Sequence, residues 1–391
     1  MLGTIQPLPV GGCVPERSMK LLSIEPTPNP NSMKLNLDES LPKGAAFTYR
    51  PEGKEHYAPW IRALLDIPGI QSLYHAGDFI AVQRAPSAPW EALLAQAREV
   101  LGGEAAPLAS GERVQGERWG EVRIAVQQFR HLPMLVKVSD DQEELRVPLP
   151  GRFGDAVQRA ASASPNMLAE RRWIPQPPRF GAVRDVGEAV AAEIDAAYGQ
   201  PRLESLIQQA FQAGAEAPEI RVKPAPTELP RLLADPDWKQ RYAALEATGA
   251  DPDCLAHLVA AMGDPHASVR RLATVLAGLV GTPEVLEPLI RALKDPAVAV
   301  RRSAGDALND LGDPAALPAM ADALADPNKL VRWRAARFLF ESGERGQLPA
   351  LARAQDDPEF EVRMQVRQAL ERIEGGQAAQ GPVWMRMTQK S

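Results

Sequence analysis

The chain has 391 residues, of which 45% are hydrophobic and 24% are charged, and its formal net charge is −6. That length predicts two or three domains. The acidic balance argues against a general attraction to nucleic acid or anionic lipid. No apolar run approaches the ~18 residues that cross a bilayer, and the two cysteines, Cys13 and Cys254, cannot form a disulfide framework. We therefore expect a multidomain cytoplasmic protein that does not enter a membrane.

The N-terminal region has the pattern of a small α+β domain. Residues 1–18 are expected to be a disordered extension, because a good strand sequence begins only at Met19. From there to residue 103, short strand and helix patterns alternate, and glycine or Pro-Gly pairs follow the helices. The predicted elements are strands Leu21–Glu25 and Met33–Leu37, helix Tyr57–Asp66, a hairpin of Gln71–His75 with Phe79–Arg84, and helix Trp90–Leu101.

The stretch Glu25–Leu35 is unusual because three prolines alternate with polar residues. Each proline fixes its own φ and pushes the preceding residue into an extended geometry, so the segment is stiff. By composition alone, a linker or a rigid turn between two strands is favoured over a binding site. As a binding site, the segment would present a dense set of polar side chains, and the candidate docking residues are Thr27, Asn29, Asn31, Ser32 and Lys34.

The same stretch resembles the Thr-Pro-Asn-Pro-Asn-Ser-x-Lys signature that opens the N-terminal domain of NifU-like (Nfu) iron–sulfur scaffold proteins. The similarity extends to Ala63–Ile70, Gly77–Val82 and Trp90–Leu94, and covers residues 19–103. Family members that assemble clusters carry a separate domain with a Cys-x-x-Cys pair, which this sequence lacks. A cluster needs about four thiolates or substitutes for them. We therefore expect no metal and no cofactor on this chain, and expect the motif to dock an iron–sulfur carrier or assembly protein.

The middle region, residues 118–216, is expected to form a second α+β domain. Strands are predicted at Val122–Phe129, Met134–Val138 and Glu144–Leu149, followed by helices near 152–173, 185–198 and 201–213. No glycine-rich phosphate loop, catalytic triad order or metal motif occurs in the sequence. The alternative that the protein is an enzyme would place its site here, around Arg130, His131, Arg171 and Arg172.

A proline-punctuated linker, residues 217–227, precedes a repeat that covers residues 228–373 in five units. An Asp-Pro pair recurs at spacings of 29, 31, 31 and 31 residues, and an arginine stands six residues after each aspartate. A fixed period near 30 is the signature of a solenoid of stacked units. The repeated residues are Asp235, Asp264, Asp295, Asp326 and Asp357, with Arg241, Arg270, Arg301, Arg332 and Arg363.

Helix chemistry explains the repeated pairs. Aspartate caps the start of a helix and proline suits its first turn, so each unit is predicted to be two helices joined by a tight Asp-Pro turn. Arg301 should point away from Asp295 and reach the turn of an adjacent unit, which would make a ladder along the solenoid. The repeat resembles the HEAT repeat family. Residues 374–391 are expected to form a flexible tail.

Solenoids of this kind mostly bind proteins along a concave face, and residues 228–373 carry 18 Lys and Arg against 22 Asp and Glu. That balance argues against a nucleic-acid partner. The domain order resembles the bacterial family labelled conserved virulence factor C. The expected fold is therefore multidomain: an α+β Nfu-like domain, a small α+β middle domain and an all-α HEAT-like solenoid. The expected function is a non-enzymatic cytoplasmic adaptor that grips a client protein and is linked to iron–sulfur maturation.

Overall fold

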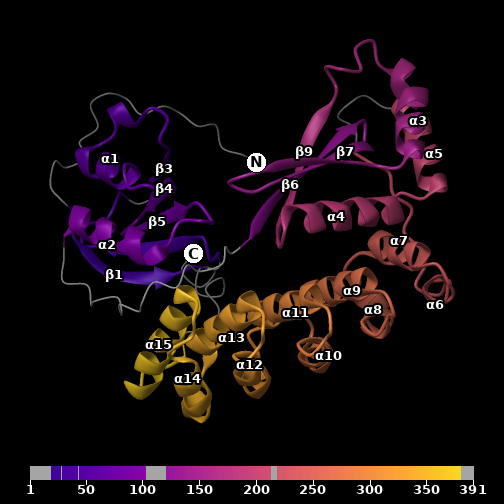
Figure 1. Ribbon diagram of the computed structural model, residues 1–391. Helices are drawn as coiled ribbons and strands as arrows, with labels where there is room; N and C mark the ends of the chain where they lie inside the picture. Colours follow the sequence, from indigo (N-terminus) through magenta and orange to yellow (C-terminus); the bar gives the residue numbers. More distant parts are fainter. Residues whose placement is uncertain (1–18, 28, 43, 103–119, 213–217, 380–391) are drawn as a thin grey trace. The chain divides into compact units, whose positions relative to one another are not determined.

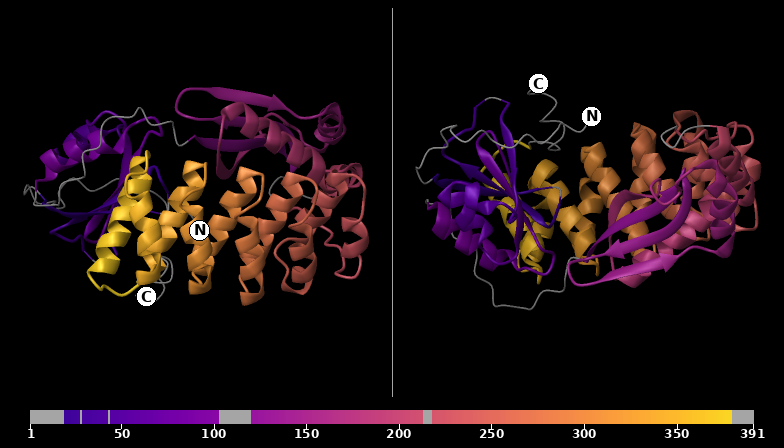
Figure 2. Two further views of the ribbon diagram at one scale, coloured as in Figure 1. Left: turned by 60° about the horizontal axis from the view of Figure 1, so that its bottom comes forward. Right: turned by 90° about the horizontal axis from the view of Figure 1, so that it is seen from above.

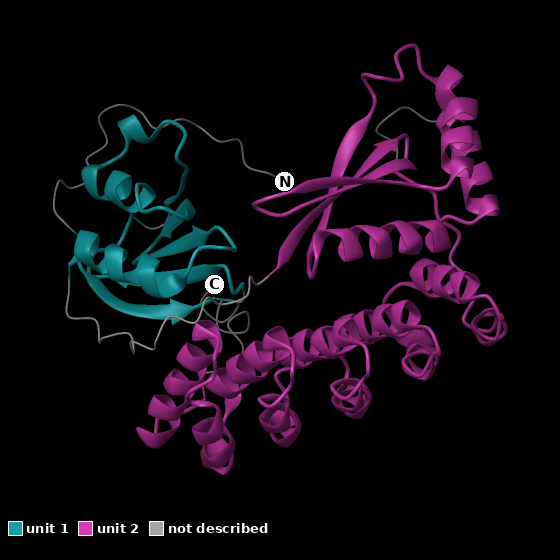
Figure 3. Cartoon of the chain, in the orientation of Figure 1, with its two compact units in different colours: residues 1–119 teal, residues 120–391 magenta. Residues whose placement is uncertain are grey.

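The computed structural model (Figure 1 and Figure 2) describes residues 19–27, 29–42, 44–102, 120–212 and 218–379. The expectations for residues 1–18 and for most of the tail at 374–391 lie outside the described residues. The chain divides into two compact units, residues 1–119 and 120–391, which are described separately below (Figure 3).

In its described residues, unit 1 is a five-stranded antiparallel sheet with two α-helices, and the strand order is β1-β2-β5-β4-β3. Leu35 pairs with Ile80, and Val82 pairs with Leu73, so the buried side chains of the central strands share the face on which the helices pack. The sequence analysis missed the edge strand β3, which is only four residues long. The elements are β1 (Leu21–Pro26), β2 (Ser32–Leu37), β3 (Ala46–Tyr49), α1 (Pro59–Leu65), β4 (Ile70–Ala76), β5 (Phe79–Arg84) and α2 (Trp90–Leu101).

The first part of unit 2 is a four-stranded antiparallel sheet, in the order β8-β7-β6-β9, with three helices. Phe129 of β6 lies in one core with Phe153 and Leu206 from α3 and α5, while Val122 of β6 lies in a second core with Val186 from α4. The elements are β6 (Glu121–Phe129), β7 (Leu132–Ser139), β8 (Glu144–Pro148), α3 (Gly151–Ala160), β9 (Arg172–Phe180), α4 (Val183–Ala197) and α5 (Gln200–Gln212).

The helix predicted over residues 152–173 is wrong beyond Ala160. Pro165 follows shortly after, and a proline inside a helix removes a hydrogen bond and clashes with the preceding turn. Arg172 and Trp173 instead begin the strand β9, which the sequence analysis missed because it contains three prolines. Proline is tolerated in a strand at the edge of a sheet, and among the described strands β9 lies at the edge, next to β6.

The rest of unit 2 is a solenoid of five helix pairs, as the repeat predicted (Figure 2). The second helices of the units form one layer and the first helices form another. Gly278 of α9 lies so close to α11 that an added Cβ would come within 2.6 Å of the Ala307 Cβ, which shows how tightly the second helices stack. The helices are α6 (Leu229–Leu233), α7 (Trp238–Thr248), α8 (Leu255–Ala261), α9 (Ala267–Val280), α10 (Leu286–Ala292), α11 (Val298–Leu311), α12 (Leu317–Ala323), α13 (Lys329–Ser342), α14 (Leu348–Ala354) and α15 (Phe360–Glu374).

The described part of the predicted linker is held by ion pairs against its neighbours. Glu219 pairs with Arg202 of α5 at 2.9 Å, Arg221 pairs with Glu246 of α7 at 2.7 Å, and Lys223 pairs with Asp251. The middle region and the solenoid therefore belong to one compact unit.

Candidate interaction surfaces

The proline-rich motif forms a turn that is stabilised by its own side chains. The Thr27 hydroxyl accepts a hydrogen bond from the Asn29 N–H at 3.2 Å and lies 3.0 Å from the carbonyl oxygens of Asn29 and Ser32. The Asn29 side chain accepts a bond from the Asn31 N–H at 2.8 Å. Threonine and asparagine side chains commonly fold the backbone in this way. Two of the proposed docking side chains are therefore engaged within the turn.

Asn31 joins this turn to the rest of unit 1. Its side chain is 0% exposed, and its backbone carbonyl accepts a bond from the Arg84 N–H at 2.9 Å. Beside it, the Trp90 indole N–H donates to the Pro30 carbonyl at 2.8 Å, and the Arg84 guanidinium lies 4.8 Å from the Trp90 ring. A docking role for the Asn31 side chain is therefore wrong: it is buried, and its work is to hold the turn against β5 and α2.

We expect Asn31→Ala to destabilise unit 1 by about 1–2 kcal/mol, because buried polar groups around it would lose a partner. Hydrogen exchange measured by mass spectrometry on peptides from β1, β2 and α2 should show faster exchange in this variant. Ser32→Ala, from the same motif, is the matched control and should leave exchange in these peptides close to that of the wild type. Equal exchange in both variants would contradict the role assigned to Asn31.

The face of the unit 1 sheet opposite the helices carries Lys34 together with two aromatic side chains. The Lys34 ammonium lies 3.0 Å from the Glu25 carboxylate and 5.1 Å from the centre of the Phe79 ring. Phe79 and Tyr74 are 6.5 Å apart between ring centres, and Tyr74 is 45% exposed. We name Lys34, Phe79 and Tyr74 the open-face cluster. Sequence reasoning missed the two aromatic residues, although both lie in predicted strands on the side opposite the core.

Two arginines of the enzyme alternative, Arg130 and Arg172, both act on the carboxylate of Glu170. Arg130 and His131 form the tight turn between β6 and β7, with φ angles of 46° and 67°. The Arg130 guanidinium donates to Glu170 at 2.7 Å and 3.2 Å and also to the Ala210 carbonyl, so it ties the turn to α5. The Arg130 hydrogen bond holds the pKa of the Glu170 carboxyl below its usual range. Arg172 lies on the exposed edge strand β9. An enzyme site here would need these side chains to be available to a substrate, and Arg130 is instead committed to a structural ion pair with Glu170.

The repeated arginines and aspartates form a ladder along the solenoid. Each of the first four arginines donates from Nε and Nη2 to both carboxylate oxygens of the aspartate in the next unit, over 2.6–3.1 Å, whereas the fifth, Arg363, donates to the Asp357 and Pro358 carbonyls of its own unit. Its Nη1 donates to the carbonyls of the Asp-Pro pair in its own unit. The pairs are Arg241 with Asp264, Arg270 with Asp295, Arg301 with Asp326, and Arg332 with Asp357. One arginine thus clamps two successive turns.

The repeated aspartate is not the helix cap that the sequence analysis expected. The residue that precedes α11 is Ala297, and Asp295 lies two residues earlier, where it accepts a bond from the Ala297 N–H at 2.7 Å. The carboxylate therefore shapes the turn before the helix. Its second and stronger role is to accept two parallel hydrogen bonds from the arginine of the preceding unit.

We expect the stability of the solenoid to fall at acid pH because of this ladder. Burial raises the pKa of the Asp264 and Asp295 carboxyls, but hydrogen bonds from Arg241 or Arg270 and from a backbone N–H outweigh it, so each pKa lies below its usual value. A carboxyl with a lowered folded-state pKa contributes stability that is complete above the unfolded value of ~3.9 and is lost as the pH falls through the folded value.

The measurement is the urea midpoint of unit 2 unfolding at a series of pH values from 7 to 2. The midpoint should fall below pH 4, and the fall should be shallower in a variant carrying Asp264→Asn and Asp295→Asn. An identical pH dependence in the two proteins would contradict the assignment.

The chain's own middle region contacts the second-helix layer of the solenoid. Glu193 of α4 is 5% exposed, and its carboxylate accepts bonds from Arg179 of β9 at 2.6 Å and from Arg271 of α9 at 2.9 Å. The Tyr242 hydroxyl of α7 lies 3.2 Å from the same carboxylate. Burial raises the pKa of Glu193, but the two arginines outweigh it and the net pKa is lowered. The sequence contained an indication of this buried ion pair, since Glu193 is an acidic residue on the apolar face of a predicted helix.

A second contact follows at the end of β9. The Arg302 guanidinium of α11 donates to the Phe180 carbonyl at 2.7 Å, and the Arg334 guanidinium of α13 lies 5.9 Å from the Phe180 ring. Successive units thus each offer an arginine to the middle region. This part of the second-helix layer is therefore covered by the chain's own middle region.

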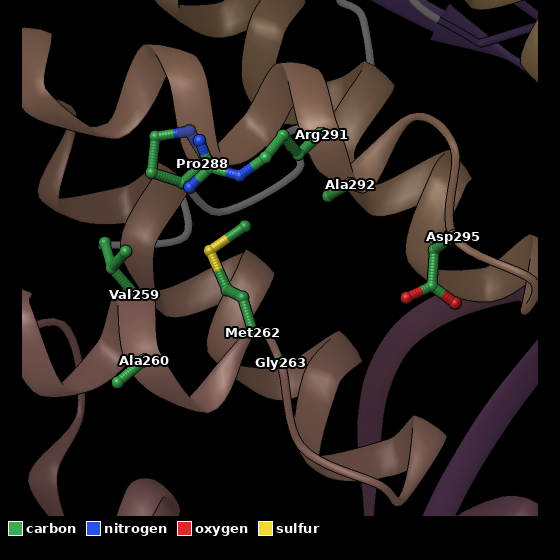
Figure 4. Close-up of a pocket in the computed structure, with 8 residues that line it drawn as sticks. All are labelled: Val259, Ala260, Met262, Gly263, Pro288, Arg291, Ala292 and Asp295. Atoms are coloured by element: carbon green, nitrogen blue, oxygen red, sulfur yellow. The ribbon is translucent and has the colours of Figure 1, made fainter.

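A small cavity of about 260 Å³ lies between the first helices α8 and α10 (Figure 4). Val259, Met262 and Pro288 give it an apolar lining, and Arg291 and Asp295 lie at its polar side. Gly263 contributes no side chain, whereas the corresponding position in the next unit is Lys294. The Asp295 carboxylate is already engaged by Arg270, so the cavity offers little polar chemistry of its own.

Cys254 is buried at the start of α8, and burial raises the pKa of its thiol. Within the described ranges, no group of three or more His, Cys, Asp or Glu side chains is placed to hold a metal ion. In the same part of the chain, no helix combines the length and apolar character that a membrane span requires.

Three family models match the chain in order. "Scaffold protein Nfu/NifU N terminal" matches residues 22–106, "Virulence factor" matches residues 127–207, and "HEAT repeats" matches residues 226–309 and 287–371. The Nfu and HEAT resemblances inferred from the sequence are thereby confirmed, together with the α+β and helical-repeat fold classes.

Two relatives are similar to nearly the whole of this chain. "Uncharacterized protein YpgR" of Bacillus subtilis is 50% identical over 371 residues, which cover 95% of this chain and 98% of the relative. "Conserved virulence factor C" of Staphylococcus aureus is 42% identical over 378 residues, covering 95% of this chain and 100% of the relative. A solved Staphylococcus aureus protein, SAV1430, is 36% identical over 21% of this chain and 98% of its own, with a TM-score of 0.20. This chain belongs to the conserved virulence factor C family.

Proposed function

We propose that this protein is a non-enzymatic adaptor that links a client protein to iron–sulfur maturation. In this proposal the Nfu-like domain binds an iron–sulfur carrier or assembly protein, and the solenoid binds the client along its concave face. The open-face cluster carries the proposal, because it combines a cation and two aromatic rings on the uncovered side of a sheet. Aromatic side chains such as those of Phe79 and Tyr74 are enriched at protein interfaces.

The proposed docking surface differs from the one the motif suggested. Thr27, Asn29 and Asn31 hold the turn together, whereas Lys34 lies on the open sheet face with Phe79 and Tyr74. Ser32 precedes Lys34 by two residues on the same strand, so it belongs to the same face. The turn of the motif therefore positions the docking face. The partner contacts the part of the motif that lies in β2, at Ser32 and Lys34.

The chemistry of the chain supports an adaptor over an enzyme. Arg130, the best placed residue of the enzyme alternative, is paired with Glu170, and the ladder arginines are paired with aspartates along the solenoid. The matched families describe a scaffold domain and HEAT repeats. Cys254 is a buried thiol with a raised pKa, which is poorly suited to act as a metal ligand. We propose that the partner, and not this chain, holds the metal.

The test uses a deletion strain of the native host, complemented with variants of the full chain. We expect deletion to lower the specific activity and bound iron of a [4Fe–4S] dehydratase without lowering the amount of its polypeptide. Wild-type protein should restore both, and a variant carrying Phe79→Ala and Tyr74→Ala should not. Arg62→Ala, at an exposed position of α1, is the matched surface control and should restore both.

Purification of the wild-type protein under anaerobic conditions completes the test. We expect no stoichiometric iron and no charge-transfer absorption. Unchanged dehydratase activity in the deletion strain would contradict the proposed link to iron–sulfur maturation. Stoichiometric iron that disappears on Cys254→Ser would contradict the proposal that a partner holds the metal.

A further inference from the structure

Positive charge is concentrated where β9 and α4 meet the second-helix layer of the solenoid. Four guanidiniums come together there, from Arg179 of β9, Arg271 of α9, Arg302 of α11 and Arg334 of α13. Among the residues that the structure describes, the carboxylates paired with these guanidiniums are those of Glu193 and Asp306. Because the Tyr242 hydroxyl is kept neutral by its raised pKa, this arginine cluster has two positive charges more than its carboxylates balance.

Both carboxylates are already engaged by arginines other than Arg302. Glu193 receives Arg179 and Arg271, as described above. Asp306 receives Arg334 through both of its oxygens, one of them at 2.9 Å from Nη2. Among the residues that the structure describes, the hydrogen bond found for Arg302 goes to the neutral carbonyl of Phe180. A guanidinium has five N–H donors, so most of its donor capacity remains.

Arg271 has spare donor capacity as well. Its Nη2 donates to Glu193, while its Nε is buried and has no hydrogen-bond partner among the described residues. A buried donor without a partner costs free energy, and native structures usually satisfy it with protein, water or a ligand.

The surroundings of Arg302 disfavour its positive charge when no ligand is bound. Burial and the neighbouring Arg334, Arg271 and Arg179 together lower the pKa of its guanidinium to about 10, and Asp306 only partly offsets them. Partly buried charges are normally paired, because desolvation of an unpaired ion is expensive. A bound anion would remove this imbalance without any change in the fold.

We propose that the arginine cluster binds a small phosphate, held by Arg302 and reached by Arg271. The planar fork of arginine matches the oxygens of phosphate through two parallel hydrogen bonds. A phosphate group carries nearly two negative charges at neutral pH, which equals the charge left unbalanced in the cluster. Arg302 is half-buried, so it is partly shielded from water and can still be reached by a small anion. The site is independent of the proposed adaptor function.

The test measures binding of inorganic phosphate to the full chain by isothermal titration calorimetry and by the thermal midpoint. Potassium chloride at matched ionic strength is the control for non-specific salt effects. We expect saturable phosphate binding and a rise in the midpoint that chloride does not reproduce. Arg302→Gln should weaken phosphate binding by at least about tenfold, since it removes a charge-assisted pair. Glutamine keeps the aliphatic stem and a neutral polar end at this half-buried position, so the fold should be retained.

Arg291→Gln, on the exposed side of α10, is the matched control and should bind phosphate as the wild type does. In chloride alone, Arg302→Gln should melt at or above the wild-type midpoint, because the unbalanced charge is gone. If Arg302 had only a structural role, Arg302→Gln would have a lower thermal midpoint than the wild type, and phosphate would not raise the midpoint of either protein. Absence of saturable binding, or equal phosphate affinity in the wild type and Arg302→Gln, would overturn the proposal.

Discussion

Asp295→Ala is expected to destabilise unit 2 by about 3 kcal/mol, several times the cost of losing an ordinary turn aspartate. The Asp295 carboxylate is nearly buried and receives two hydrogen bonds from Arg270 at 2.7 Å and 2.9 Å. Its removal would leave the Arg270 guanidinium without its partner in a water-poor environment, and breaking a buried pair from one side commonly costs 3–5 kcal/mol. The measurement is the free energy of unfolding of the full chain in urea, followed by helix circular dichroism.

Asp313→Ala is the matched control. Asp313 accepts a bond from the Ala315 N–H at 2.9 Å in the same kind of turn, and its loss should cost only about 1 kcal/mol. A double-mutant cycle of Asp295→Ala with Arg270→Ala should show strong coupling, because the two side chains are paired. The cycle with Arg301→Ala should show weaker coupling, because Arg301 contacts the backbone carbonyl of Asp295. Equal costs for Asp295→Ala and Asp313→Ala would contradict the ladder.

Glu193→Ala should destabilise unit 2 by about 3 kcal/mol or more and should separate the unfolding of the middle region from that of the solenoid. The substitution would leave the guanidiniums of Arg179 and Arg271 facing one another without a carboxylate. We expect the single urea transition of unit 2 to become broader or to divide into two. Tryptophan fluorescence and helix circular dichroism, which weight the two parts differently, should then report different midpoints.

Glu188→Ala is the control for this prediction. Glu188 lies on the same helix, where its pair with Arg184 is exposed to solvent, and exposed pairs contribute at most about 1 kcal/mol. The fragment 226–378, expressed alone, should be helical but should melt below the midpoint of the solenoid in the full chain, because it loses the Glu193 contacts. Coincident transitions in Glu193→Ala, or a fragment as stable as the full chain, would show that the junction contributes little.

The sequence by itself determined the architecture of the solenoid and most of unit 1. The Asp-Pro period fixes where each pair of helices turns, because proline and aspartate act through the local backbone. In the same way, the alternation of Met33, Leu35 and Leu37 fixes which face of β2 is buried. Such signals survive in a single sequence because residues a few positions apart in the chain carry them.

Only the tertiary structure decided what the polar residues do. Asn31 belongs to an exposed-looking motif, yet it is buried because Arg84 and Trp90, more than 50 positions away, close over its turn. Arg302 and Arg271 stand next to ladder arginines in the sequence but face the opposite way, towards Phe180 and Glu193. The edge strand β9 is recognisable only from its pairing with β6. Burial and ion pairing depend on contacts between segments that are distant in the sequence. The alternation of residues in a strand and the spacing of the repeat therefore cannot predict them.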